Sequence, residues 1–302
     1  MMDKPDCQTT IQEPVTLEGV GLHTGNPSTL TFRPAPANAG IRFFRSDLPG
    51  CPMIPARLGF VIATVRGTNL GLGDARIHTV EHVLAALTGL SIDNADISVS
   101  ANEPPAMDGS ALPFLEALMS AGLHRYPDSP KRYLHIPEEI VYEDQGSRYR
   151  AVPAEHFEID ATLLHDHPLV PKLQLRTRVD ARTFLSEIAP SRTFCFEHEI
   201  AFLRSQGLAQ GGSLENAVVI GRDKVLTTPK GLRFPDEFVR HKILDLVGDL
   251  TLIGRSLFRM RIETVRPGHA HNIEFAKLLN TAATRMRGDR AGTRPPTAAG
   301  RA

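Results

Sequence analysis

Three side chains, His241, Asp245 and Asp249, have the types and the spacing to bind one metal ion. They lie four residues apart, so on a helix they stack along one face. An imidazole and a carboxylate at positions i and i+4 can hold an ion between them. The same spacing is common on solvated polar faces, where it serves only a salt bridge to Arg240 or Lys242. Both interpretations stand at this point.

The residues around this trio predict the helix that would position it. Pro235 and Asp236 suit a helix start, because proline loses nothing in the first turn and Asp caps free N–H groups. Apolar residues then recur at helical spacing and form a stripe, namely Phe238, Val239, Ile243, Leu246, Val247, Leu250 and Ile253. The stretch therefore predicts an amphipathic helix.

A second motif, His78-Thr-Val-Glu81-His82, stands at the start of another predicted helix. The apolar positions of that helix are Ile77, Val80, Val83, Leu84, Leu87 and Leu90. His-x-x-Glu-His is the inverted zinc-protease motif, in which both histidines bind zinc and the Glu is the base. In a second interpretation Glu81 and His82 are active and His78 is a bystander. In a third there is no chemistry, since Glu near a helix N-terminus is favoured by the dipole.

Counting ligands separates these interpretations. His82, His241 and Asp245 give two imidazoles and one carboxylate, a zinc set with one position open for water. Adding His78 would give four protein ligands and a closed, structural site. Hydrolysis needs the open position, because zinc makes a bound water acidic enough to attack at neutral pH. We therefore favour one catalytic Zn²⁺ without His78, although Fe²⁺ could occupy the same mixed set.

Other polar residues complete a hydrolytic site. Glu81 is adjacent to a ligand and can take the proton of the attacking water. His269, expected in a loop after a strand, could protonate a leaving amine, and Asp249 could hold it in the charged form. Thr193 could stabilise an oxyanion.

Composition limits the function classes. The chain has 302 residues with 34 basic and 34 acidic side chains, which gives no reason to expect nucleic acid as a partner. No stretch approaches a membrane span, and the start lacks the apolar run of a signal peptide. Three widely spaced cysteines, Cys7, Cys51 and Cys195, favour a reducing cytoplasm over a disulfide framework.

The order of predicted elements indicates an α+β fold made of two related domains. Each half runs strands, long site helix, strand, loop and second helix, which suggests a duplicated unit of one sheet packed on two helices. We expect the domains at 1–126 and 131–283, joined by a Pro-containing linker. The segment 194–220, a helical stretch followed by a strand, has no counterpart in the first half and is interpreted as an insertion. Residues 284–302 are expected to be a disordered tail.

An ordered set of motifs resembles a known family. The set comprises Gly19-Val-Gly-Leu-His-Thr-Gly25, Thr79-Val-Glu-His82, Met107-Asp-Gly-Ser110, Arg192-Thr-Phe194, Phe238-Val-Arg-His-Lys-Ile-Leu-Asp245 and Gly268-His-Ala-His-Asn272. From about residue 8 to residue 282 it is similar to UDP-3-O-acyl-N-acetylglucosamine deacetylases, the zinc amidases of lipid A synthesis. The resemblance implies hydrolysis of a linear amide, releasing acetate and UDP-3-O-acyl-glucosamine, at a site in the cleft between the domains.

The resemblance also assigns roles position by position. It implies that His82, His241 and Asp245 bind zinc. Glu81 would be the general base, and His269 would be the general acid, supported by Asp249. Thr193 would contact the oxyanion, Lys242 a phosphate and the sugar, and Phe194 the sugar ring. The insertion would form an apolar passage for the acyl chain, which we expect to be lined by Ile200, Leu203, Leu208, Ala217 and Val219.

Two positions depart from the family pattern. His165 stands where some relatives have an aromatic residue that stacks on uracil, and His271 stands where many have an apolar residue. We expect a monomer. Two alternatives stay open: a zinc peptidase that uses His78 as a ligand, and a non-catalytic binding module stabilised by a metal.

Overall fold

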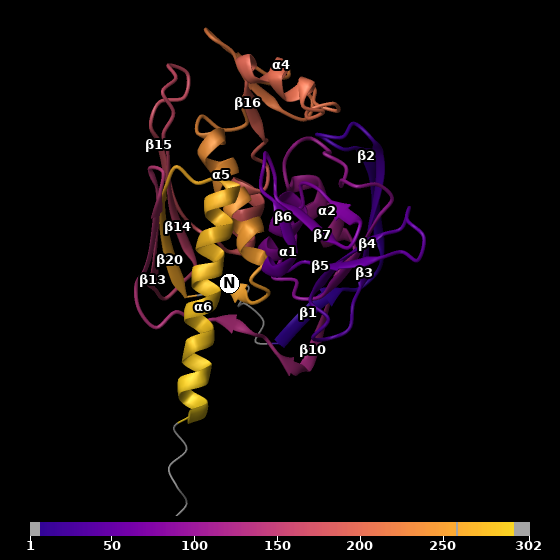
Figure 1. Ribbon diagram of the computed structural model, residues 1–302, viewed down its shortest axis with the longest axis vertical. Helices are drawn as coiled ribbons and strands as arrows, with labels where there is room; N and C mark the ends of the chain where they lie inside the picture. Colours follow the sequence, from indigo (N-terminus) through magenta and orange to yellow (C-terminus); the bar gives the residue numbers. More distant parts are fainter. Residues whose placement is uncertain (1–6, 258, 293–302) are drawn as a thin grey trace, which may run out of the picture.

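The computed structural model describes residues 7–257 and 259–292, and within them the chain forms two halves of mixed α and β structure (Figure 1). The first half has a five-stranded sheet in the spatial order β2-β3-β9-β4-β5. Its strands are β2 (Val15–Val20), β3 (Pro27–Pro34), β4 (Ile41–Arg45), β5 (Met53–Pro55) and β9 (Ala95–Val99). Its helices are α1 (Glu81–Gly89) and α2 (Leu112–Ser120).

The second half repeats this plan strand for strand. Its five-stranded sheet has the order β12-β13-β20-β14-β15. The strands are β12 (Ile140–Asp144), β13 (Ser147–Pro153), β14 (Glu158–Leu163), β15 (Leu173–Arg178) and β20 (Met260–Val265), and the helices are α5 (Glu237–Thr251) and α6 (His269–Gly292). In each sheet the last strand of the half pairs in parallel with one neighbour, β9 with β4 and β20 with β14. The duplication predicted from the element order is therefore confirmed.

Both halves carry a small extra sheet just before their long site helix. The first has β6 (Val61–Ala63), β7 (Asn69–Leu72) and β8 (Ala75–Ile77), preceded by the short turn η1 (Leu58–Phe60). The second has β16 (Phe194–Phe196), β17 (Val218–Ile220) and β18 (Val225–Leu226), preceded by α3 (Ala181–Thr183) and η2 (Phe184–Ile188). The expectation that the insertion has no counterpart in the first half is wrong.

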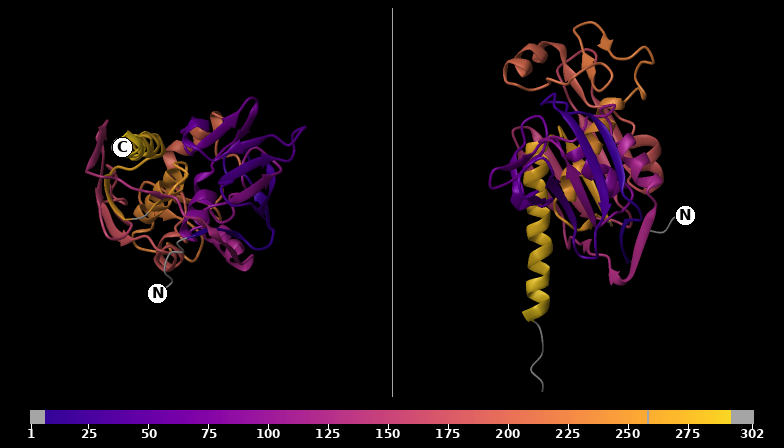
Figure 2. Two further views of the ribbon diagram at one scale, coloured as in Figure 1. Left: turned by 90° about the horizontal axis from the view of Figure 1, so that it is seen from below. Right: turned by 90° about the vertical axis from the view of Figure 1, so that its right-hand side faces the viewer.

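The insertion in the second half is larger, because it also carries α4 (Glu197–Ser205) between β16 and β17. The stretch expected to be helical from Phe194 thus begins as a strand and becomes helix only at Glu197. This insertion stands at one end of the molecule, above the two five-stranded sheets (Figures 1 and 2).

The expected linker is itself a strand. β10 (Leu123–Pro130) pairs antiparallel with β1 (Cys7–Ile11), and β11 (Tyr133–Leu134) pairs in parallel with β19 (Ser256–Leu257). The domain junction is therefore tied by backbone hydrogen bonds to β1 on one side and to β19 on the other. At the other end, α6 continues to Gly292, so residues 284–292 are helical, since Arg, Ala and Met favour helix despite the lack of an apolar stripe. The remaining tail residues, 293–302, lie outside the described residues.

Two predicted helix starts differ from the structure. Asp236 is the N-cap residue of α5, but its side chain caps no N–H group and instead accepts a hydrogen bond from Arg240 Nε at 2.6 Å. Helix α1 begins at Glu81 rather than at His78, because Thr79 has a positive φ of 54° that a helix cannot contain.

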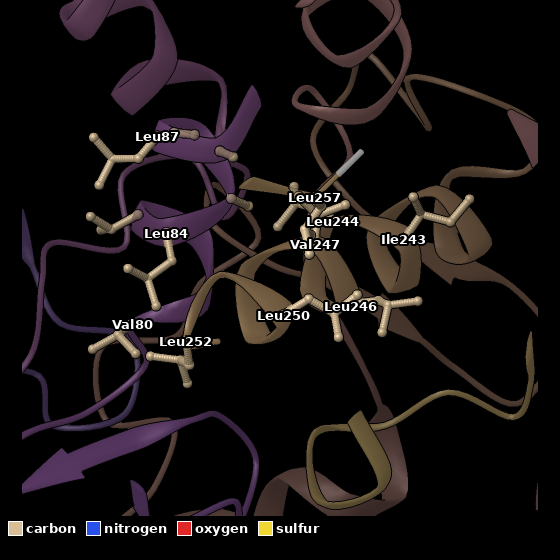
Figure 3. Close-up of a cluster of buried hydrophobic side chains, with 14 of the residues drawn as sticks. Val80, Leu84, Leu87, Ile243, Leu244, Leu246, Val247, Leu250, Leu252 and Leu257 are labelled. Carbon is tan, nitrogen blue, oxygen red and sulfur yellow. The ribbon is translucent and has the colours of Figure 1, made fainter. Parts of the chain in front are cut away.

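Helices α1 and α5 pack against each other at the centre of the molecule. Figure 3 shows Val80, Leu84 and Leu87 on the first-half side, and residues such as Leu244 and Val247 on α5. The helices come close because α5 carries Gly248 where they meet. A Cβ added there would lie 2.1 Å from the carbonyl oxygen of Glu81. This missing side chain lets the start of α1 rest on α5.

We predict that Gly248→Ala destabilises the protein by about 1–3 kcal/mol, the range for overpacking, although alanine favours a helix by about 1 kcal/mol over glycine. Urea unfolding measures this change. The matched control is Gly59→Ala, because a Cβ at Gly59 would meet no atom within 4 Å. An unchanged free energy of unfolding for Gly248→Ala would contradict the close approach.

Candidate metal and catalytic site

Three metal-capable side chains meet where α1 and α5 touch. His82 comes from the first turn of α1, and His241 and Asp245 come from successive turns of α5. One ligand atom from each lies within 4.8 Å of the other two. Asp245 Oδ1 is 3.2 Å from His241 Nε2 and 3.7 Å from His82 Nε2. All three side chains are buried. The three residues selected from the sequence therefore form one cluster, to which both halves contribute.

The hydrogen bonds of His241 determine which ring nitrogen faces the cluster. Nδ1 lies 3.0 Å from the carbonyl oxygen of Ser191, which can only accept, so Nδ1 carries the proton and Nε2 presents a lone pair. Burial lowers the pKa of His241 to about 3, which keeps the ring neutral. Two bare acceptors, Nε2 and Asp245 Oδ1, therefore face each other.

Asp245 Oδ1 is buried and has no hydrogen-bond partner among the described residues. A buried acceptor without a donor costs about 1–3 kcal/mol, more when it is charged. A cation between the three ligand atoms removes this penalty. The donor set therefore fits a divalent metal ion with nitrogen and oxygen preference, as in three-ligand zinc sites.

Lys242 binds the other oxygen of the same carboxylate. Its Nζ is 2.9 Å from Asp245 Oδ2 and lies 5.3 Å from the centre of the Phe194 ring. Burial alone would raise the pKa of Asp245, but the positive groups around it, Lys242 among them, hold that pKa well below its usual range. Asp245 is thus ionised and oriented toward the cluster.

Glu81 and His269 flank the metal cluster. His269 Nε2 lies 3.9 Å from Glu81 Oε1 and 3.7 Å from Asp245 Oδ2. Its Nδ1 is 3.0 Å from Asp249 Oδ2. Burial would lower the pKa of His269, but Asp249 above all, with Asp245 and Glu81, raises it to about 9. Burial raises the pKa of Glu81, and the charge of His269 acts in the opposite direction.

His269 is the first residue of α6 rather than part of a loop. The strand β20 ends at Val265, and Pro267 and Gly268 turn the chain so that α6 starts beside the site. The predicted support by Asp249 is present as a hydrogen bond. His271, the second imidazole, faces away from the cluster and lies within hydrogen-bond distance of Tyr142 Oη, at 3.1 Å.

A buried ion pair positions Thr193 and the Ser191 carbonyl. Arg192 Nε is 2.8 Å from Glu237 Oε1 at the start of α5, and both side chains are almost fully buried. Arg192 also donates its backbone N–H to Glu237, and Thr193 donates its own to the carbonyl of Gly109. The segment before β16 is therefore held rigidly next to His241.

A cavity of about 230 Å³ opens beside Thr193 and Phe194 in the insertion. Four of the five residues expected to form an apolar passage line it, Ile200, Leu203, Ala217 and Val219. Leu208 is not among the lining residues, because α4 ends at Ser205 and the chain turns at Gly207, φ 74°, so Leu208 does not continue the face of Ile200 and Leu203. His165 is exposed and lies with its ring 5.1 Å from that of Phe196.

Sequence reasoning missed the first-half wall of this cavity. Leu22, His23 and Arg66 line it too. His23 accepts a hydrogen bond from the backbone of Ala209, and Arg66 pairs with Glu199 of α4. The Gly-rich turn 19–25 is one of the ordered motifs, and tertiary contacts that its sequence does not predict bring it against the insertion.

The chain matches one known protein family over most of its length. The family model described as UDP-3-O-acyl N-acetylglycosamine deacetylase matches residues 8–281. The chain belongs to this deacetylase family. Among its relatives is a UDP-3-O-acyl-N-acetylglucosamine deacetylase of Anaeromyxobacter sp. strain Fw109-5, 45% identical over 88% of this chain and 86% of that protein.

Two further relatives agree. A deacetylase of the same printed name from Anaeromyxobacter dehalogenans is 44% identical, over 92% of this chain and 90% of its own length. A bifunctional enzyme LpxC/FabZ of Chlorobaculum tepidum is 40% identical over 92% of this chain, which spans 65% of that longer protein. The family resemblance predicted from the ordered motifs is confirmed.

The deacetylase family is metal-dependent, and the cluster of His82, His241 and Asp245 suits that property. His78 does not join it: it precedes α1, and its backbone N–H bonds the carbonyl of Asn102. The inverted protease motif is therefore not formed on one helix face. No helix within residues 7–257 and 259–292 has the length and apolar character to cross a bilayer.

We predict that His82→Ala and Asp245→Ala each lower bound metal from about one ion per chain toward zero, because removing one of three ligands leaves too few. Elemental analysis of the purified protein measures this. His78→Ala is the matched control and should keep its metal. Loss of metal from His78→Ala, with retention in His82→Ala, would reverse the assignment.

Proposed function

We propose that this deacetylase hydrolyses the N-acetyl group of UDP-3-O-acyl-N-acetylglucosamine, giving UDP-3-O-acyl-glucosamine and acetate in lipid A synthesis, with one Zn²⁺ as its metal. The observation that carries this proposal is the placement of Glu81 and His269 on the rim of a buried two-imidazole, one-carboxylate cluster in a member of this family. His82, His241 and Asp245 would hold the ion. Bound zinc supplies Lewis-acid chemistry, activating water and polarising the amide carbonyl. Fe²⁺ suits the same donors.

Glu81 acts as the general base. Its Oε2 accepts the backbone N–H of Thr68 at 2.9 Å, which leaves Oε1 to take the proton of the attacking water. Its carboxylate lies beside the cluster, because Glu81 Oε1 is 3.9 Å from His269 Nε2, which is itself 3.7 Å from Asp245 Oδ2.

His269 acts as the general acid through Nε2, since Nδ1 is committed to Asp249. A pKa raised to about 9 keeps the ring protonated at neutral pH. The proton on Nε2 is then available to the amine as the C–N bond breaks.

The remaining contacts follow from position. Thr193 lies on the cavity wall next to Phe194 and would stabilise the oxyanion. The ammonium of Lys242 would meet a substrate phosphate or sugar oxygen, and Phe194 the sugar ring. His165, exposed beside Phe196, would face the uracil side.

The cavity beside Phe194 would receive the 3-O-acyl chain. Its apolar wall comes from Ile200, Leu203, Ala217 and Val219. Each buried CH₂ contributes about 0.8 kcal/mol, so a chain of about ten carbons can supply much of the binding free energy.

The proposal includes a monomeric enzyme of two domains, 1–126 and 131–283. One chain supplies the ligands, the base and the acid, so no second copy is needed for chemistry. Cys7, Cys51 and Cys195 are unpaired, which suits the cytoplasm.

We predict acetate release from UDP-3-O-acyl-N-acetylglucosamine that a chelator abolishes and added Zn²⁺ restores. The de-acylated substrate should react with a kcat/KM at least tenfold lower, because the passage then stays empty. Equal kcat/KM for both substrates would count against the passage alone. If neither substrate released acetate, the proposed activity would be wrong, and the alternative of a metal-stabilised binding module would stand.

We predict a bell-shaped pH profile of kcat/KM. Activity falls as pH rises through about 9, because His269 then loses the proton that it donates, and it falls at low pH as Glu81 gains one. His269→Ala should lose the basic limb and about two to four orders of magnitude in rate. His271→Ala is the matched control and should keep both limbs. A basic limb that persists in His269→Ala would make Glu81 serve both steps.

A further inference from the structure

Thr68 lies in the loop between β6 and β7, in the small sheet of the first half, and its side chain is fully buried. The chain approaches the site closely here. A Cβ added to the preceding Gly67 would lie 3.1 Å from Glu81 Oε1. The loop therefore rests directly against the carboxylate of the proposed base.

All three polar groups of Thr68 bind residues at the site. Its N–H donates to Glu81 Oε2 at 2.9 Å, and its carbonyl accepts from the N–H of Val80, just before α1, at 3.1 Å. Its hydroxyl donates to Asp249 Oδ1 at 2.5 Å. Thr68 thus spans the two halves and touches both the base and the carboxylate behind the acid.

Asp249 depends on this hydroxyl for its orientation. Its Oδ2 receives His269 Nδ1 and the Asn272 amide at 2.8 Å. The Asn272 amide is fixed in turn, because its Oδ1 accepts the hydroxyl of Tyr149 at 2.6 Å. Among the described residues, Thr68 is thus the hydrogen-bond donor to Asp249 Oδ1. Without that hydroxyl a buried carboxylate oxygen loses its partner, and the carboxylate can rotate away from His269.

We propose that Thr68 is a positioning residue of the deacetylase. Its backbone sets the carboxylate of Glu81, and its hydroxyl sets Asp249 and, through Asp249, the ring of His269. Base and acid, which come from different halves, therefore keep one relative geometry. This inference rests on the proposed function, because it concerns the acid of that reaction.

The test removes only the hydroxyl. Thr68→Val keeps the β-branched shape and the backbone N–H, whereas Thr68→Ser keeps the hydroxyl. We expect Thr68→Val to lower kcat about 10- to 100-fold, the usual loss for an outer hydrogen-bond partner, with KM and bound metal unchanged. Thr68→Ser should stay within about threefold of the unchanged enzyme. The matched control is Thr251→Val, because Thr251 is on the same helix as Asp249 but its hydroxyl bonds Thr88.

A double-mutant cycle shows whether the hydroxyl acts through His269. In a His269→Ala background, Thr68→Val should cause no further loss of kcat. An equal loss in both backgrounds, or a Thr68→Ser variant as slow as Thr68→Val, would overturn the proposal. Thr68→Ala serves as a second variant if Thr68→Val unfolds below the assay temperature. Should the unchanged enzyme release no acetate, the proposed function fails before this question arises.

Discussion

The contact between α1 and α5 is the constraint on which the site depends. Gly248 lets the carbonyl of Glu81 touch α5, and that contact places Glu81 and His82 over the turn of α5 that carries Asp245 and Asp249. A larger residue at position 248 would separate Glu81 and His82 from the other half. The apolar stripe of α5, including Leu244 and Val247, holds the two helices at this distance. Because cores are close-packed, the site inherits the rigidity of the interface.

Charge balance explains why this interface needs a cation. Glu81, Asp245 and Asp249 are three buried acidic groups, and Lys242 with a protonated His269 provides two positive charges against them. Buried charges are stable only when paired. Among the described residues no group donates a hydrogen bond to Asp245 Oδ1, so a bound cation there would supply the remaining positive charge. The same ion would lower the proton affinity of Glu81, whose pKa burial raises.

Sequence patterns predicted those parts of the site that lie within one element. His241, Asp245 and Asp249 share one face of α5, so their spacing in the sequence predicts that they lie together. The motif that begins at His78 left several interpretations open, because five residues cannot show that Thr79 takes a left-handed conformation and that α1 begins only after it. Thr68 and Asp249 are 181 residues apart, and no periodicity connects them. Arg66 and His23 also line the cavity only through tertiary contacts, which a sequence pattern does not contain. The small sheets β6–β8 and β16–β18 agree in strand order and in their place before the site helix, but β6 and β7 pair antiparallel whereas β16 and β17 pair in parallel.

Two imidazoles of the site acquire opposite properties from the balance of burial and charge around each. Burial lowers the pKa of His241 to about 3 and outweighs the nearby Asp245 carboxylate, which raises it, while His241 Nδ1 lies against the neutral carbonyl of Ser191. His269 Nδ1 faces the carboxylate of Asp249, so despite burial its pKa rises to about 9. A metal ligand must be neutral, whereas a general acid must carry its proton at the working pH. Environments that push two similar groups apart in this way support the two proposed roles. The proposed ligand and the proposed acid thus differ in the charge around each ring, and on the side of the proposed acid the support runs through Asp249 to Thr68 of the other half.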